Sequence, residues 1–185
     1  MDLNSVKTKK IRIAFTIALC VVMALYYVVC ALPMITYTHQ TGDLAGQEET
    51  ISLSSFIWKP YNHSDITGTQ PLNDLFKAEL QKKVNLPINH TIPGPMFAFV
   101  GAFISILVVA ICWKKAFNVY FPVVWGVGSI LLYLINPLLQ LSIIDSSILM
   151  LHYILFALAI VIAVAEFFLI SLPQIKYERA NREIY

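Results

Sequence analysis

The segment NHTIPGPMFAFVG, residues 89–101, marks the point where this chain changes from polar to purely apolar. The tripeptide NHT has the pattern of a glycosylation acceptor. The following PGP ends any helix that arrives from the preceding residues, because proline lacks the N–H that a helix interior needs. We interpret this junction as the place where the chain enters a lipid bilayer from a segment kept outside it.

The composition of the whole chain is that of a membrane protein. It has 185 residues, of which 58% are hydrophobic and 13% are charged, whereas a soluble domain carries about 25% charged residues. Its mean hydropathy is +0.70. The net charge of +2 and the absence of a long basic run argue against nucleic acid as a partner. We therefore expect the lipid bilayer to be the surroundings of most of the chain.

Four long apolar runs predict an all-α integral membrane protein, a bundle of four transmembrane helices. Each run has at least the roughly 18 residues that cross about 30 Å of hydrocarbon as a helix. We expect these helices at residues 11–32, 96–113, 120–144 and 148–172. The first run is longer than the ~7–15 apolar residues of a signal peptide, so we interpret it as a retained helix.

The remaining segments complete the predicted organisation. Residues 1–10 form an N-terminal tail and residues 173–185 a C-terminal tail. The loop 114–119 joins the second and third helices, and the turn 145–147 joins the third and fourth. A small, partly ordered module would lie at residues 33–95, between the first and second helices.

The basic residues predict the orientation. Nine of the 13 Lys and Arg residues lie in three short segments, before the first helix, after the second and after the fourth. Short loops follow the positive-inside rule most reliably. We therefore expect both tails and the loop 114–119 in the cytoplasm, the module 33–95 outside, and a location in the plasma (cytoplasmic) membrane.

Two segments of the module carry a regular pattern. In ETISLSSFIW, residues 49–58, apolar residues alternate as in a strand. In PLNDLFKAELQKKV, residues 71–84, apolar residues recur every three to four positions and predict an amphipathic helix. Its apolar face can cover the chain's own bundle or bind a partner. The candidate partner-binding residues are Leu72, Leu75, Phe76 and Leu80.

The module also holds two glycosylation patterns and most of the histidines. The patterns begin at Asn62 and Asn89, and would accept a glycan in a eukaryotic secretory pathway. Imidazole and carboxylate groups can bind zinc, but no two histidines have the spacing that places two ligands on one helix face. We therefore expect no metal site and no cofactor. The weak metal candidates are His39, His63, Asp65, His90 and His152.

Glu166 is the acidic residue inside an apolar run. A charge in hydrocarbon costs about 2.5–3.5 kcal/mol on insertion scales, so such residues are candidates for a function. Counted from the start of the fourth helix, Glu166 would lie close to the cytoplasmic boundary. There it would pair with Lys114 or Lys115 as an anchor, and an ion-coupling role is the alternative.

Asn136 and Pro137 predict a kink in the third helix, because proline removes a backbone hydrogen bond and disfavours helix at the residue before it. Gln140 lies about one turn further on. Broken helices line cavities in transporters. The simpler interpretation is that the kink lets the end of an overlong helix lie at the outer interface.

Catalytic motifs are absent from the sequence, which has no phosphate-binding glycine loop, nucleophile elbow or zinc-protease pair. We expect a non-enzymatic polytopic membrane protein, an accessory or interaction subunit that presents its outer module to a membrane-protein partner or to further copies of itself. The alternative is a small transporter or channel subunit with a polar path near Asn136, Gln140 and Glu166.

Overall fold

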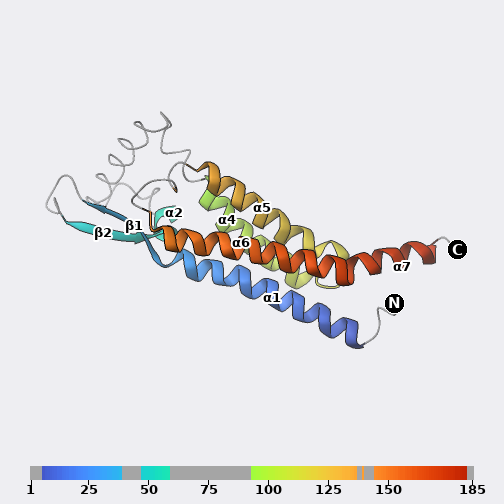
Figure 1. Cartoon of the computed structure of the whole chain (residues 1–185). Helices are drawn as coiled ribbons and strands as arrows, with labels where there is room; N and C mark the ends of the chain where they lie inside the picture. The colour runs from blue at the N-terminus through green and yellow to red at the C-terminus, as the bar shows by residue number, and fades with distance from the viewer. Residues whose placement is uncertain (1–5, 39–46, 59–92, 137–138, 140–143, 183–185) are drawn as a thin grey trace. The chain divides into compact units, whose positions relative to one another are not determined.

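The computed structural model describes residues 6–38, 47–58, 93–136, 139 and 144–182 (Figure 1). It is mostly helical. Four helices are long and apolar enough to cross a membrane, and they cover Thr8–Cys30, Gly94–Ile111, Ala116–Ile135 and Ser146–Tyr177. This confirms the prediction of a helical protein with four membrane-spanning candidates.

The elements follow one another in the order helix, hairpin, short helix and then a series of longer helices. They are α1 (Val6–Cys30), β1 (Pro33–Thr38), β2 (Glu48–Ser52), α2 (Leu53–Trp58), α4 (Pro93–Ile111), the 3-10 turn η3 (Ala116–Val119), α5 (Tyr120–Ile135), α6 (Ser146–Glu166), the π-helical turn η5 (Phe167–Ser171) and α7 (Leu172–Arg182).

The contacts divide the chain into two compact units. Unit 1 comprises residues 1–26, 100–128 and 154–185, and unit 2 comprises residues 27–99 and 129–153. Each of the four long helices contributes residues to both units. The units differ in charge, since unit 1 has nine basic and four acidic residues, a net charge of +5, and unit 2 has four basic and seven acidic residues, a net charge of −3.

Unit 1 has an aromatic core formed by one residue from each of α1, α5 and α6. Tyr26, Trp125 and Phe156 are at most 1% exposed, and their ring centroids lie 5.2–5.5 Å apart. Two of the three pairs meet edge to face, which adds to the stabilisation that burial gives. Gly126 lets α5 approach α6, because a Cβ at this position would lie 2.9 Å from the carbonyl oxygen of Phe156.

Unit 2 contains a two-stranded antiparallel sheet that begins shortly after α1 ends. Ile35 of β1 lies opposite Ile51 of β2, and both side chains are buried. The residues before α6 contact the other edge of β1, where the Asp145 N–H donates to the carbonyl oxygen of Met34 over 2.8 Å. The hairpin is thus tied to the end of α1 by the chain and to the start of α6 by hydrogen bonds.

The segment 49–58 is only partly the strand that its alternation predicts. The strand ends at Ser52 and helix α2 follows at once. The Ser52 hydroxyl accepts a hydrogen bond from the Ser55 N–H over 3.1 Å, as the cap of a helix start does. Leu53 and Ile57, four residues apart, therefore share one buried helix face instead of alternating across a sheet.

The PGP motif lies in the first turn of α4 rather than before it. Proline is well suited there, because the first N–H groups of a helix have no partner within it. The glycine, Gly94, allows a close approach, since a Cβ would lie 3.2 Å from the carbonyl oxygen of Leu132 in α5. Three residues after Leu132, α5 stops at Ile135, just before the Asn136-Pro137 pair that disfavours helix.

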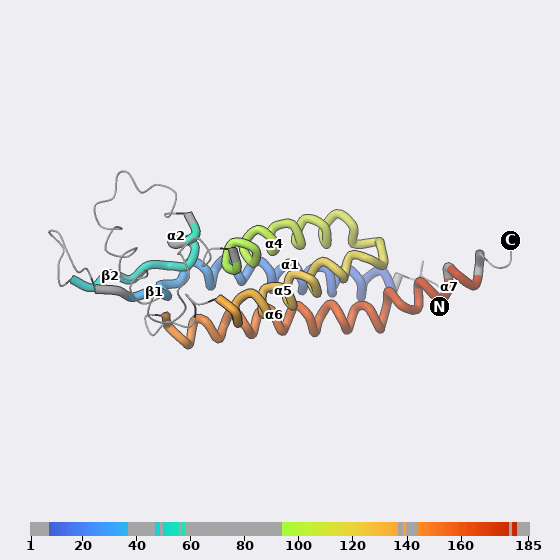
Figure 2. The backbone as a smooth tube through the Cα atoms, turned by 90° about the horizontal axis from the view of Figure 1, so that it is seen from above, coloured from blue at the N-terminus to red at the C-terminus, as the bar shows by residue number. Residues whose placement is uncertain are grey.

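The last helix is longer than the sequence predicts. The chain runs without a break from α6 through η5 into α7, as the tube in Figure 2 shows, and remains helical to Arg182. Residues 173–182, expected to belong to a tail, therefore extend this helix. These residues are of mixed polar character and form no apolar run, so the apolar pattern did not predict a helix here. The segment does contain good helix formers.

Candidate functional site

Unit 1, which contains both chain termini, buries a group of polar side chains. They are buried although they come from separate elements: Thr8 and Arg12 from α1, Asn118 from η3, Glu166 from α6 and Ser171 from η5. We call Arg12, Asn118, Glu166 and Ser171 the Glu166 cluster.

Arg12 links three parts of unit 1. Its Nη1 donates to the carbonyl oxygen of Lys114 over 2.9 Å, and its Nη2 donates to Oε1 of Gln174 in α7 over 2.6 Å. The side chain is 8% exposed. Because guanidinium keeps its charge at all ordinary pH values, this residue places a permanent positive charge inside the unit.

Glu166 is the last residue of α6 and is fully buried. Neither carboxylate oxygen completes a hydrogen bond of standard geometry with the described residues. Asn118 lies close enough to stabilise the negative charge, and Arg12 attracts it through its own charge. The amide oxygen and nitrogen of Asn118 also lack a hydrogen bond of standard geometry. The two side chains therefore lie near each other with hydrogen-bonding capacity left over.

The π-helical turn η5 begins directly after Glu166. Such turns are rare, hold one more residue than an α-helical turn, and are frequent at functional sites. Ser171, at the end of η5, is fully buried and its hydroxyl also lacks a hydrogen bond in the described part of the chain. The turn packs against η3, the element that carries Asn118.

This arrangement can bind a small polar species. Buried polar groups in proteins are nearly always hydrogen-bonded, and those that are not point to a bound water, an ion or a chemical role. Two carboxylate oxygens, an amide oxygen and a hydroxyl oxygen are the donor atoms that hard cations prefer. A carboxylate in a low-dielectric interior is also a strong acceptor for a proton.

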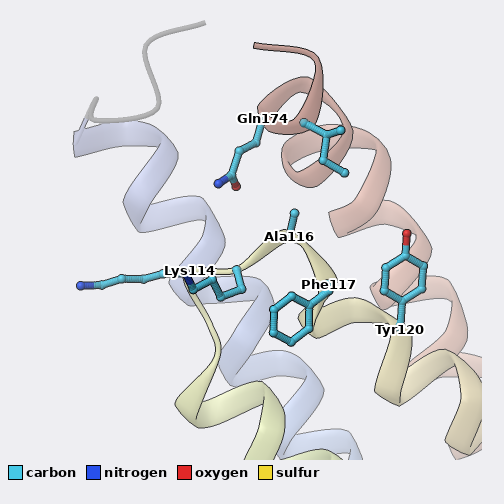
Figure 3. A pocket seen from close by; sticks show the side chains of 7 residues that line it. Lys114, Ala116, Phe117, Tyr120 and Gln174 are labelled. Carbon is cyan, nitrogen blue, oxygen red and sulfur yellow. The ribbon is translucent and has the colours of Figure 1, made fainter. Parts of the chain in front are cut away.

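A pocket of about 430 Å³ lies beside the Arg12 hydrogen bonds. Gln174 lines this pocket (Figure 3). The same side chain accepts the hydrogen bond from Arg12. The Lys114 side chain extends away from the other labelled residues in Figure 3, and its Nζ lies 5.3 Å from the centroid of the Trp113 ring. The lining residues are Lys114, Lys115, Ala116, Phe117, Tyr120, Gln174 and Ile175.

The structure gives Glu166 a set of polar neighbours. We expected this residue near the cytoplasmic boundary beside Lys114 or Lys115, and that depth in the membrane stays a prediction. Within the described residues, its polar neighbours are Asn118 and Arg12, and Arg12 in turn donates to the carbonyl oxygen of Lys114.

The two described residues of the other predicted sites belong to unit 2. His152 is fully buried, its Nδ1 donates to the carbonyl oxygen of Ile148 over 3.0 Å, and its Nε2 lies 3.6 Å from the sulfur of Cys30. Because a carbonyl only accepts, Nε2 is left to accept from the thiol in the neutral ring. Asn136 is buried just after the end of α5. Neither residue shares a unit with Glu166.

The described ranges contain no group of three or more His, Cys, Asp and Glu residues that could hold a metal ion. The other predicted site residues lie outside the described residues. These are the metal candidates His39, His63, Asp65 and His90, the partner-binding residues Leu72, Leu75, Phe76 and Leu80, the glycosylation candidates Asn62 and Asn89, and Gln140 of the polar path.

The sequence analysis missed Asn118, Ser171 and Gln174, and used Arg12 only to orient the chain. No motif spacing joins Arg12 and Asn118 to the others, because both lie far from residues 166–174 in the sequence. One signal was available: a buried intramembrane carboxylate requires polar neighbours, and the nearest candidates are the few polar residues beside the same helix ends.

The chain matches no model of a known family, no curated protein and no solved structure. The functional conclusion therefore rests on the geometry of unit 1.

Proposed function

We propose that this protein is a small transporter or channel subunit, and that the Glu166 cluster is the site that binds the transported or coupling ion, a proton or a monovalent cation. One observation carries the proposal: a fully buried carboxylate whose two oxygens complete no hydrogen bond with the described residues. Glutamate is among the residues least often buried unless it is paired. Its retention inside an apolar helix favours a role beyond folding.

The cluster offers a simple way to couple ion binding to a movement. A proton or cation at Glu166 neutralises the charge that attracts Arg12. Arg12 in turn holds the Lys114 carbonyl and the Gln174 side chain. Occupation of Glu166 would therefore weaken the attraction between Arg12 of α1 and the end of α6, and would let Arg12 shift together with the two groups that it holds.

The charges of the units support an orientation for this proposal. Unit 1 is positive and unit 2 is negative, and cytoplasmic segments of membrane proteins carry the excess of Lys and Arg. We propose that both termini and the loop 114–119 face the cytoplasm and that the module at residues 33–95 faces outward, in the plasma membrane. We also propose that the protein has no enzymatic activity.

The experiment is ion flux into liposomes that contain the protein together with whatever copurifies from native membranes. A pH-sensitive dye inside the liposomes reports proton flux, and Na⁺- and K⁺-sensitive dyes report the two cations. We expect flux with the wild type and its loss in Glu166→Gln, which keeps the shape of the side chain and removes its charge. Glu48→Gln, the same change at an exposed acid of β2, should leave the flux intact.

A second outcome would contradict the proposal. If Glu166→Gln and the wild type carry the same flux, or if neither carries protons, Na⁺ or K⁺, the cluster is structural. Glu166→Asp is the control for a folding defect, since it keeps the charge and moves it by one methylene. This variant should reduce the flux without abolishing it.

The β1–β2 hairpin favours a second proposal, an accessory subunit that presents the module at residues 33–95 to a membrane-protein partner. The hairpin is anchored by the Asp145–Met34 hydrogen bond, so it would display attached residues at a fixed place in unit 2. Extraction in mild detergent followed by mass spectrometry tests this. A stoichiometric partner that is lost when Leu75 and Phe76 are replaced by Asp supports it, and a chain that purifies alone contradicts it.

A further inference from the structure

We infer that the pocket lined by Lys114, Lys115, Phe117, Tyr120, Gln174 and Ile175 binds the headgroup of an anionic phospholipid. This goes beyond the proposed function, because it concerns a surface pocket and not the buried carboxylate. It rests on the position of the pocket, the character of its lining and the charge of unit 1.

The pocket lies where the apolar part of a helix ends. Ile111, the last residue of α4, is 77% exposed, as a lipid-facing side chain is. Lys114 follows three residues later, with its Nζ 5.3 Å from the centroid of the Trp113 ring. Tryptophan and lysine at the end of an apolar helix mark the headgroup level of a bilayer. A ligand that binds in this pocket would therefore lie at the depth of the lipid headgroups.

The lining suits a ligand that is charged at one end and apolar at the other. Lys115 lines the pocket and is exposed, and Lys114 lines it as well, with a long side chain whose ammonium extends outward from the rim. Phe117 and Tyr120 line it too and remain 47% and 53% exposed. Basic pockets between transmembrane helices bind anionic headgroups in this way, with acyl chains along neighbouring apolar surface.

The surroundings favour an anion over a neutral lipid. Gln174 forms part of the lining and accepts a hydrogen bond from Arg12. The positive charge of the Arg12 guanidinium therefore lies next to this part of the lining. Unit 1 as a whole has a net charge of +5. The volume of about 430 Å³ falls within the range of ligand pockets, ~300–1,000 Å³. A phosphate group supplies the required charge, and the apolar lining selects its lipid form over soluble phosphate.

The experiment is a thermal-stability titration of the purified full chain in a nonionic detergent. The probes are phosphatidylglycerol, phosphatidylcholine and soluble glycerol phosphate. We expect phosphatidylglycerol alone to raise the unfolding temperature. The double variant Lys114→Gln/Lys115→Gln should bind this lipid about thirty-fold more weakly, because each lysine near an anionic headgroup contributes about fivefold.

The matched control is Lys9→Gln/Lys10→Gln, which removes the same charge from two exposed lysines of α1 in the same unit. It should leave phosphatidylglycerol binding within about threefold of the wild type, as is typical for exposed charges that do not touch the ligand. Equal weakening in the two double variants would overturn the proposal in favour of unspecific attraction. An equal response to phosphatidylcholine, or an equal response to glycerol phosphate, would overturn it as well.

A second measurement keeps the proposal testable if the Lys114/Lys115 variant does not fold. Native mass spectrometry of the wild type, purified from an equimolar mixture of the two lipids, should show phosphatidylglycerol retained in preference. Retention of both lipids in the proportions of the mixture would overturn the inference.

Discussion

Unit 2 encloses polar side chains that are neutral and hydrogen-bonded, whereas unit 1 encloses a carboxylate and a guanidinium. In unit 2, His152 donates to Ile148, and the Tyr27 hydroxyl donates to the Phe99 carbonyl oxygen over 2.7 Å. The hydroxyl of Ser129, which lacks a hydrogen bond among the described residues, is the exception. In unit 1, the oxygens of Glu166 complete no such bond.

Buried polar groups can have two different roles in an apolar interior. A neutral group with a partner costs little and fixes the position of a helix. A charged group with spare hydrogen-bonding capacity costs much more, and proteins keep such groups mainly at functional sites. The buried polar groups of unit 2 therefore suit a role in holding the helices together, and those of unit 1 support the binding site that we propose there.

The largest expected effect comes from removing one charge of unit 1. Arg12→Met leaves Glu166 buried without its cationic neighbour, and we expect a loss of about 3–5 kcal/mol in the free energy of unfolding. The double variant Arg12→Met/Glu166→Leu removes both charges at similar volume and should recover most of that loss. Unfolding in mixed micelles with increasing dodecyl sulfate measures both. A cost below about 1 kcal/mol for the single variant would show that the charges are not coupled.

A smaller effect is expected in unit 2. His152→Ala removes the donor to the Ile148 carbonyl and the neighbour of Cys30, and should cost about 1–3 kcal/mol. Ion flux should stay at the wild-type level, since both ring nitrogens of His152 contact groups of unit 2 and neither belongs to the Glu166 cluster. His152→Gln retains a side-chain donor and should cost less. Loss of flux in a folded His152→Ala protein would remove the distinction between the units.

The smallest effect is local to the hairpin. Ser52→Ala removes the hydroxyl that caps α2 and should cost about 1 kcal/mol. Amide hydrogen exchange should accelerate in residues 53–58 and remain unchanged in the long helices. Ser54→Ala is the control, because the Ser54 hydroxyl lies 3.0 Å from the Ser52 hydroxyl and accepts no N–H of the helix start in the described part of the chain. Equal exchange in the two variants would mean that the cap contributes nothing.

The four apolar helices could be predicted because hydrophobic length is a property of the sequence alone. The ends of the elements were harder. PGP appeared to precede a helix and instead opens it, and residues 49–58 change from strand to helix at a single serine. In each case, the start of the helix depends on whether a backbone N–H has a hydrogen-bond partner. The periodicity of apolar residues contains no information about that.

Only one residue of the candidate site could be predicted from the sequence. Glu166 stands out because an acid in an apolar run is rare. Arg12, Asn118 and Gln174 do not stand out, because each lies in a polar or mixed segment near a helix end, where such residues are common. Their convergence depends on tertiary packing within unit 1, which the spacing of residues in one chain does not specify.

The π-helical turn η5 also sets the rotational phase of the helix that follows it. Each residue of an α-helix turns the chain by about 100°, so a regular helix would place Gln174 about 80° around the axis from Glu166. The extra residue in the π turn removes one such step and brings the two to within about 20° of each other. The same shift moves Ser171 from about 140° to about 40° from Glu166. One inserted residue thus aligns the carboxylate, the hydroxyl and the amide along a single side of an unbroken helix, in register with Arg12.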